Sequence, residues 1–352
     1  MKRIVFDCER MKYANTGIYS YCFQLGMRLQ QQANPRNEEV IFFTPPSIKG
    51  IFGKHSDYIL QNSLQKFWLP SLRKYDIWHS TYQNSHYLPL LDHKIKVVLT
   101  IHDLNFLYDQ KKSQAKKAKY LRYVQKNIRR SSAIVTISEF AKSDILKYCD
   151  VGNRAVVAIL NGTNSLEAPV LLCNSYRPRA RFLFSIGVVN RKKNFHVLLP
   201  LLQQNSDIEL LIAGPADDPD YLHFMKDRAR ILGVEEKLRV LGPISEAEKS
   251  WYYSHCYAFA FPSLSEGFGL PVAEAMSVGK PVFLSDRTAL PEIGRDVAFY
   301  FHDFNEQRMQ HVFTRGMEDY TRDKMEDRIR QRSTDFCWRR AASQYLELYR
   351  SL

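Results

Sequence analysis

The sequence predicts an α/β fold made of two doubly wound domains. Short apolar runs rich in β-branched and aromatic residues recur along the chain, and segments of helical periodicity separate many of them. Strands that alternate with helices form a parallel sheet that is covered on both faces. The series occurs twice, and a chain of 352 residues suits two domains of about 150 residues each.

The expected elements follow in chain order. In the first half, strands are predicted at residues 4–6, 40–43, 77–78, 97–101, 133–137 and 156–159. In the second half, they are predicted at residues 182–186, 208–213, 238–241, 258–261 and 281–284. Helical periodicity marks residues 18–31, 115–130, 139–149 and a terminal segment, 338–352. Turn and linker residues between 161 and 178 divide the chain into domains of residues 1–165 and 166–335.

Composition excludes several classes of protein. An apolar fraction of 45% can fill two cores and argues against disorder. No apolar run approaches the length of about 20 residues that a membrane-spanning helix needs, and the N-terminus lacks a signal peptide, so a cytoplasmic protein is expected. The six cysteines lie far apart without a CxxC pair. We therefore expect buried, reduced thiols rather than disulfides or a metal site.

The positive charge is unevenly distributed. Residues 1–170 contain 25 lysines and arginines against 13 acidic residues, whereas residues 171–352 contain 25 against 24. This asymmetry predicts an anionic partner for the first half alone.

The most informative motif is a glycine-rich loop after the expected strand 258–261. It leads into a helix that opens at Pro271 and ends before Gly279. Backbone N–H groups of such a loop and helix start form an anion site suited to a diphosphate. Glu274 can accept hydrogen bonds from a ribose diol, and Glu266 can do so from a hexose. The alternative is a plain turn with solvated glutamates.

Three further motifs follow expected strands. The strand 182–186 leads to Gly187 and then to a run of cations ending in Lys193, which can neutralise a diphosphate or form a solvated surface. His102 can bond a sugar hydroxyl with Asp103 orienting it, or it is a structural histidine. Gly17 permits close approach of a phosphate. The full GxGxxG fingerprint is absent, which counts against an NAD enzyme.

A basic stretch at residues 111–130 contains no acidic residue. Aromatic and aliphatic residues interleave with its cations, which is typical of a helix that lies on an anionic membrane. A solvated helix face is the alternative, and nucleic acid is the least favoured partner. The predicted membrane or acceptor patch comprises Lys111, Lys112, Lys116, Lys117, Lys119 and Arg122.

These residues resemble those of the retaining glycosyltransferase family 4, along nearly the whole chain. The segment from Glu266 to Glu274 is similar to the family's E-x7-E element, and shorter similarities lie at residues 100–104, 135–140, 160–162, 279–282 and 289–293. The resemblance implies a GT-B fold, in which two Rossmann-like domains face a cleft. It also implies that a C-terminal helix, residues 336–352, crosses back to the first domain.

The resemblance implies a role for each matching residue. Glu274 would hold the donor ribose, and Glu266 and His102, with Asp103 beside it, would contact the transferred sugar. The other implied donor contacts are Gly17, Lys192 and Lys193 at the diphosphate, Gly242 and Ile244 at the base, and the backbone of Gly267, Phe268, Gly269 and Leu270.

Two positions depart from the family pattern. Lys192 stands where an arginine is usual, so a bidentate guanidinium contact is lost. Thr16 and Tyr19 stand beside Gly17 where glycines are common, which crowds the acceptor side.

The expected reaction is metal-independent transfer of a hexose, of mannose or glucose type, with retention at the anomeric carbon. The nucleoside-diphosphate sugar is a co-substrate and no cofactor is expected. The acceptor would be a glycan or a lipid-linked glycan in cell-surface polysaccharide or lipopolysaccharide synthesis, met at the inner face of the membrane. The alternatives are a catalytically silent nucleotide-sugar-binding partner and a phosphorylase or epimerase on the same fold.

Overall fold

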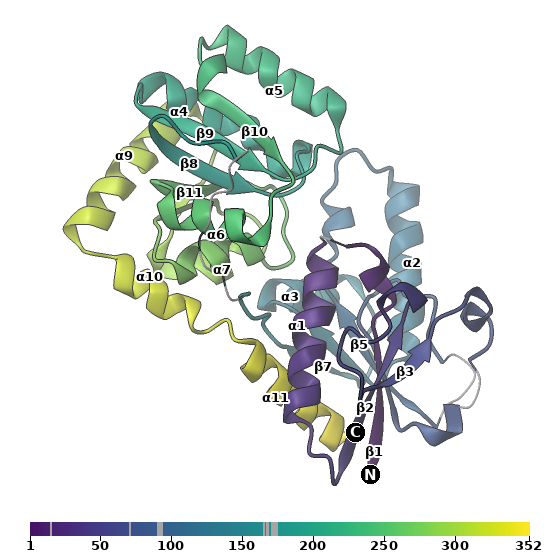
Figure 1. Cartoon of the computed structure of the whole chain (residues 1–352). Helices are drawn as coiled ribbons and strands as arrows, with labels where there is room; N and C mark the ends of the chain where they lie inside the picture. The colour runs from purple at the N-terminus through teal and green to yellow at the C-terminus, as the bar shows by residue number, and fades with distance from the viewer. Residues whose placement is uncertain (15, 70–71, 90–93, 165, 167–168, 170–174) are drawn as a thin grey trace. The chain divides into compact units, whose positions relative to one another are not determined.

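A computed structural model describes residues 1–14, 16–69, 72–89, 94–164, 166, 169 and 175–352 (Figure 1). The chain divides into two compact units. Unit 1 comprises Met1–Gly162 and Cys337–Leu352, and unit 2 comprises Thr163–Phe336. The predicted boundary at residue 165 falls on a residue outside the described ranges, as does Asn15 of the predicted first turn.

Unit 1 contains a sheet whose described strands are all parallel, in the order β3-β2-β1-β4-β5-β6-β7. The strands are β1 (Lys2–Asp7), β2 (Glu38–Thr44), β3 (Asp57–Leu60), β4 (Ile77–Ser80), β5 (Lys96–Ile101), β6 (Ala133–Thr136) and β7 (Ala155–Ala158). The helices are α1 (Gly17–Gln32), α2 (Gln114–Arg130), α3 (Glu139–Tyr148) and α11 (Trp338–Ser351). The central strands are buried on both faces, as expected of a parallel sheet covered by helices.

Unit 2 contains a second parallel sheet, in the order β10-β9-β8-β11-β12-β13. Its strands are β8 (Arg181–Ile186), β9 (Ile208–Ala213), β10 (Leu238–Gly242), β11 (Ala258–Phe261), β12 (Val282–Ser285) and β13 (Phe299–Phe301). Its helices are α4 (Leu199–Gln204), α5 (Pro219–Ile231), α6 (Glu246–His255), α7 (Leu270–Ser277), α8 (Leu290–Gly294), α9 (Glu306–Arg322) and α10 (Glu326–Ser333). The prediction of two doubly wound domains is confirmed. The strands β3 and β13, both at sheet edges, were not predicted.

The C-terminal helix α11 belongs to unit 1 and lies beside α1 (Figure 1). Its apolar stripe is buried, and the hydroxyl of Tyr345 lies 2.7 Å from that of Tyr21 in α1. Gly162 allows the returning chain to pass closely, because a Cβ there would lie 2.2 Å from the backbone nitrogen of Trp338. The return of the C-terminal helix to the first domain is therefore confirmed.

The described cysteines are free thiols. Cys8, Cys22, Cys149 and Cys256 are buried and Cys337 is partly exposed, while Cys173 lies outside the described residues. Burial raises the pKa of Cys149 to about 11, so this thiol stays protonated and behaves as a small apolar side chain.

No described helix is both long enough and apolar enough to cross a membrane.

Candidate functional site

Three neighbouring strands of unit 2 lead to glycines at their carboxyl ends. Gly187, Gly214 and Gly242 close β8, β9 and β10, and their φ angles are 146°, 125° and 72°. A Cβ on Gly214 would lie 2.2 Å from the carbonyl oxygen of Gly187. The backbones can approach this closely only without side chains, and the carboxyl edge of a parallel sheet is where ligands bind in this class of fold.

Lys193 lies directly over this edge. The 3₁₀ turn η6 (Arg191–Lys193) brings its side chain across Gly187, where a Cβ would lie 2.9 Å from the lysine Cε. Its Nζ lies 2.7 Å from Oε1 of Glu266 and 4.5 Å from the ring centre of Phe261. The neighbouring Lys192 is exposed. The structure therefore places one cation inside the site and one at its rim.

The Lys193–Glu266 pair is largely removed from water. Burial lowers the pKa of Lys193, against the attraction of Glu266. Burial also opposes ionisation of Glu266, but Lys193 and Lys192 outweigh it, and the pKa of this carboxyl lies below its usual value. The carboxylate is thus ionised and held beside an ammonium group. The ammonium group can turn to an anionic ligand group, and the carboxylate can turn to a hydrogen-bond donor of a ligand.

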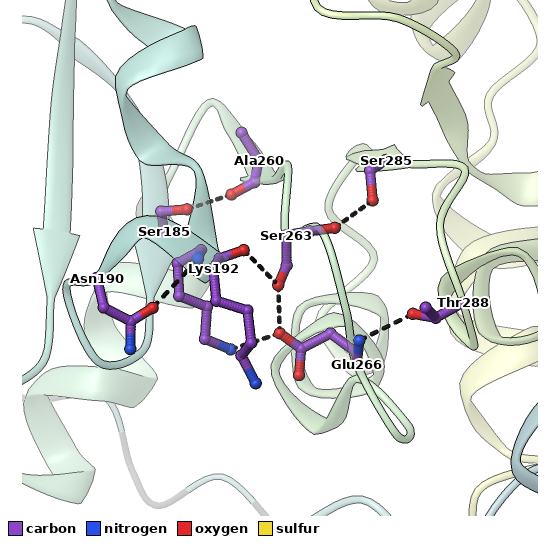
Figure 2. A network of polar contacts seen from close by, with 9 residues as sticks. Ser185, Asn190, Lys192, Ala260, Ser263, Glu266, Ser285 and Thr288 are labelled. Atoms are coloured by element: carbon purple, nitrogen blue, oxygen red, sulfur yellow. Dashed lines mark hydrogen bonds and ion pairs between the residues drawn. The ribbon is translucent and has the colours of Figure 1, made fainter. Parts of the chain in front are cut away.

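Hydroxyl groups hold the loop that carries Glu266 (Figure 2). Ser263 donates a hydrogen bond to the Glu266 carboxylate, and Ser285 donates to the carbonyl of Ser263. The backbone N–H of Glu266 donates to Oγ1 of Thr288 at 2.8 Å. Thr288 has a φ of 53°, which is rare for a β-branched residue. Strain of this kind persists where the surrounding structure enforces it, and it is concentrated at functional loops.

The helix α7 begins without a side-chain cap. Its N-cap is Gly269, with a φ of 110°, and a Cβ there would lie 2.8 Å from Leu290. The first-turn N–H groups of such a helix attract anions, as the sequence predicted. The helix begins at Leu270, one residue earlier than expected, so Pro271 is its second residue rather than its first. Phe268 is buried edge-on against Phe336, at 5.5 Å between ring centres.

Glu274, on the same helix, is buried and bonded to three side chains. Its Oε1 accepts from Asn164 Nδ2 at 3.0 Å and from Lys249 Nζ at 3.2 Å, and its Oε2 accepts from Tyr253 Oη at 3.1 Å. Burial raises the pKa of Glu274, against the opposing effect of Lys249. A carboxylate offers about four acceptor sites, so a ribose hydroxyl would join or replace one of these partners.

The two positions assigned to the base lie at the end of β10. Gly242 accepts a hydrogen bond from Gly214 N at 2.8 Å, and a Cβ on it would meet nothing within 4 Å. Ile244 is half-buried and precedes Ser245, which forms a capping box with Glu248 at the start of α6. The space beside Gly242 is therefore open.

In unit 1, His102 is buried at the end of β5. Its Nε2 lies 2.8 Å from the carbonyl oxygen of Thr81, so Nε2 carries the proton and Nδ1 is an acceptor. Burial lowers the pKa of His102, which favours the neutral ring. Asp103 instead accepts from the backbone N–H of Asn105 at 2.9 Å. The carbonyl of Thr81, and not the carboxylate of Asp103, therefore orients the His102 ring.

Gly17 is the first residue of α1, and a Cβ on it would meet nothing within 4 Å. Thr16, one of the two departures from the family pattern, is the N-cap of this helix and accepts from Tyr19 N at 3.2 Å. Capping of this helix is therefore a local structural reason for a threonine at position 16.

The basic patch is only partly available to a partner. Lys111, Lys116, Lys119 and Arg122 are exposed. Lys112, in contrast, pairs with Asp109, and Lys117 Nζ donates to the carbonyl of Leu107 at 2.7 Å. The patch is smaller than predicted, because these two side chains satisfy groups of the protein itself.

The structure brings Lys193, Glu266 and the glycine-ended strands together in unit 2, while His102 and Gly17 belong to unit 1.

Sequence reasoning missed Ser263, Thr288 and Lys249. The spacing of Lys249 and Tyr253, four residues apart on one helix face, was a usable signal for a shared target. The described residues contain no group of three or more histidines, cysteines or carboxylates arranged for a metal ion.

Two sequence profiles match the two halves of the chain. The family described as "Glycosyl transferases group 1" matches residues 175–335, and "Glycosyltransferase Family 4" matches residues 21–165. The chain belongs to glycosyltransferase family 4. Its two parallel-sheet domains are those of the GT-B class.

Relatives of this family 4 glycosyltransferase include enzymes of O-antigen synthesis. The O-antigen chain mannosyltransferase RfbU of Salmonella typhimurium is 27% identical over 64% of this chain, a match that spans only 61% of that relative. The O-antigen chain mannosyltransferase B of Escherichia coli is 23% identical over 99% of this chain and 100% of its own length. The crystal structure of Anabaena HepE in complex with UDP-glucose shares the fold, with a TM-score of 0.78, 16% identity and full coverage of both chains.

Proposed function

We propose that this protein is a retaining, metal-independent hexosyltransferase that uses a nucleoside-diphosphate sugar. The observation that carries the proposal is the buried Lys193–Glu266 pair over the glycine-ended strands, beside the uncapped start of α7. A diphosphate leaving group needs positive charge, and its sugar needs hydrogen-bond acceptors. This site offers both.

Donor binding would separate Lys193 from Glu266. The Lys193 ammonium would turn to the diphosphate, together with Lys192 and the N–H groups of α7, and would stabilise the charge that develops on the leaving group. Glu266 would then accept hydrogen bonds from the hexose hydroxyls. In the free protein the two groups satisfy each other, which avoids the cost of an unpaired buried charge.

Retention follows from a front-face route in this proposal. The acceptor hydroxyl would attack from the side on which the diphosphate departs, and a departing phosphate oxygen would take its proton. Neutral His102, with Nδ1 as an acceptor, would bind a hydroxyl of the transferred sugar. No covalent sugar–enzyme intermediate is then needed.

We further propose that the hexose is of mannose type and that the acceptor is a growing O-antigen-type glycan on a lipid carrier, at the inner face of the membrane. RfbU and mannosyltransferase B, which match this chain, are named as O-antigen chain mannosyltransferases. The positive charge of unit 1 suits an acceptor that carries phosphate.

A thermal-shift panel of nucleoside diphosphates and their mannose and glucose derivatives tests the donor site. A ligand that binds only the native state raises the melting temperature. We expect one base series to stabilise the wild type and Glu266→Gln to weaken the response to the sugar nucleotide more than the response to the bare diphosphate. No shift at millimolar ligand would reject the donor site, and binding without transfer to any acceptor would favour the catalytically silent alternative.

A further inference from the structure

Four of the large apolar side chains that unit 1 exposes lie within nine residues of each other. They are Leu60, Leu64, Phe67 and Trp68, and the last three are 77%, 84% and 67% exposed. They lie at the end of β3 and around the 3₁₀ turn η3 (Ser63–Lys66), and we call the last three the apolar turn. Clustered exposure of this kind marks an interaction surface, whereas single exposed apolar residues are ordinary.

The backbone of the apolar turn is held by specific hydrogen bonds. Asn62 and Gln65 form a capping box, in which Asn62 Oδ1 accepts from Leu64 N at 3.0 Å and Gln65 Oε1 accepts from Asn62 N at 2.8 Å. Gln65 is buried, and the N–H groups of Phe67 and Trp68 both donate to the carbonyl of Leu64. The exposure of the apolar side chains therefore belongs to an ordered turn.

Three cations lie within or shortly after the apolar turn in the sequence, and one of them, Lys74, also interacts with the carboxylates of Glu39 and Asp57. Lys66 lies within it, and Arg73 and Lys74 follow in the next turn, η4 (Leu72–Lys74); all three are exposed. No acidic residue occurs between Tyr58 and Tyr75 in the sequence. Phenylalanine, tryptophan and leucine enter the boundary between lipid headgroups and acyl chains, and adjacent lysine and arginine bind anionic headgroups.

We propose that the apolar turn inserts Leu64, Phe67 and Trp68 into the surface of an anionic membrane. The charge of the turn complements such a membrane, and the size of the three side chains suits shallow insertion rather than spanning. The cations on α2 supply an attraction that salt screens, and the apolar turn adds a contact that salt does not screen. This proposal stands independently of the donor and of the reaction.

Vesicle co-sedimentation tests the proposal, with phosphatidylglycerol-containing vesicles compared with pure phosphatidylcholine at low and high salt. We expect the wild type to bind the anionic vesicles and to retain part of that binding at 0.5 M salt, on the order of the concentrations that screen surface charges. The double variant Phe67→Ser/Trp68→Ser should bind at least about tenfold less, since both inserted rings are lost. Ile231→Ser is the matched control, because Ile231 is 84% exposed on α5 and belongs to unit 2.

Tryptophan fluorescence separates insertion from simple attraction. Trp78 and Trp338 are buried and Trp251 is half-buried in unit 2, so only the part of the quenching by brominated lipids that disappears in Trp68→Phe reports on Trp68. Melting temperatures and the donor-induced thermal shift should stay unchanged in all variants, which separates this proposal from the donor site. Equal binding of the double variant, unquenched Trp68 emission, or no vesicle binding by the wild type would each overturn the proposal; in the last case a protein partner becomes the candidate occupant.

Discussion

The two units use their lysines and arginines in opposite ways. Unit 1 contains 28 of them against 13 acidic residues, and unit 2 contains 22 against 24. In unit 2, two cations of the candidate site are buried and paired, Lys193 with Glu266 and Lys249 with Glu274, while Lys192 is exposed at the rim. In unit 1, Lys116, Lys119 and Arg122 of α2 and Lys66 of the apolar turn are exposed.

This difference separates two kinds of electrostatics. Removing one member of a buried ion pair is costly, because the other member is left as an uncompensated buried charge. An exposed cation contributes little by itself and is screened by salt. Variants in unit 2 should therefore have large effects that salt does not change, and variants on the surface of unit 1 should have small effects that salt removes.

The largest effect is expected from Lys193→Met. This variant removes the buried cation that would stabilise the leaving diphosphate, and we expect kcat to fall by about 10²–10³. Arg191→Met is the matched control, because Arg191 is exposed in the same turn and stacks over Phe224 at 5.4 Å. Steady-state transfer rates measure the effect, and a comparable loss in the control would contradict the assignment.

Lys249→Met should act through Glu274. Without the lysine, burial raises the pKa of Glu274 further, and donor affinity should fall by about tenfold, mainly in KM. Donor binding needs the ionised carboxylate and is lost as pH falls, so in the variant this loss should begin at a higher pH. Lys249→Arg should restore part of the affinity. An unchanged pH profile of KM would leave Lys249 with a purely structural role.

Asp7 in unit 1 provides a stability test. Burial raises its pKa to about 7, from 3.8, despite hydrogen bonds from Glu9 N and Ser85. Because the folded pKa is raised, the stabilisation is present at low pH and is lost as pH rises toward 7. Relative to Asp7→Asn, the unfolding free energy of the wild type should fall by about 2–3 kcal/mol between pH 5 and pH 8. Urea unfolding at both pH values measures this, and parallel pH dependences would refute it.

The smallest effect is expected on α2. Replacing Lys116, Lys119 and Arg122 by alanine should weaken binding to anionic vesicles several-fold at low salt, at about 1 kcal/mol or less per cation, and should have no effect at high salt. Lys112→Ala is the control, since Lys112 already pairs with Asp109. A loss that persists at high salt would break the distinction between the two units.

Sequence reasoning succeeded where a pattern is local. The alternation of apolar runs with helical segments predicted most strands, and the glycine and proline positions predicted the loop and start of α7 within one residue. It missed β3 and β13, which are short edge strands of four and three residues. An edge strand pairs on one side only, so its apolar run is brief and hard to distinguish from loop.

The sequence by itself determined the two-domain α/β architecture and the residue types of the site. Local periodicity and turn chemistry suffice for these, because each depends on residues close together in the chain. Only the tertiary structure decided which groups satisfy one another. Asn164 and Lys249 meet at Glu274 across 110 and 25 positions, and Lys193 meets Glu266 across 73 positions. Burial and pairing set the charge and availability of each side chain, and both arise from contacts that no local pattern records.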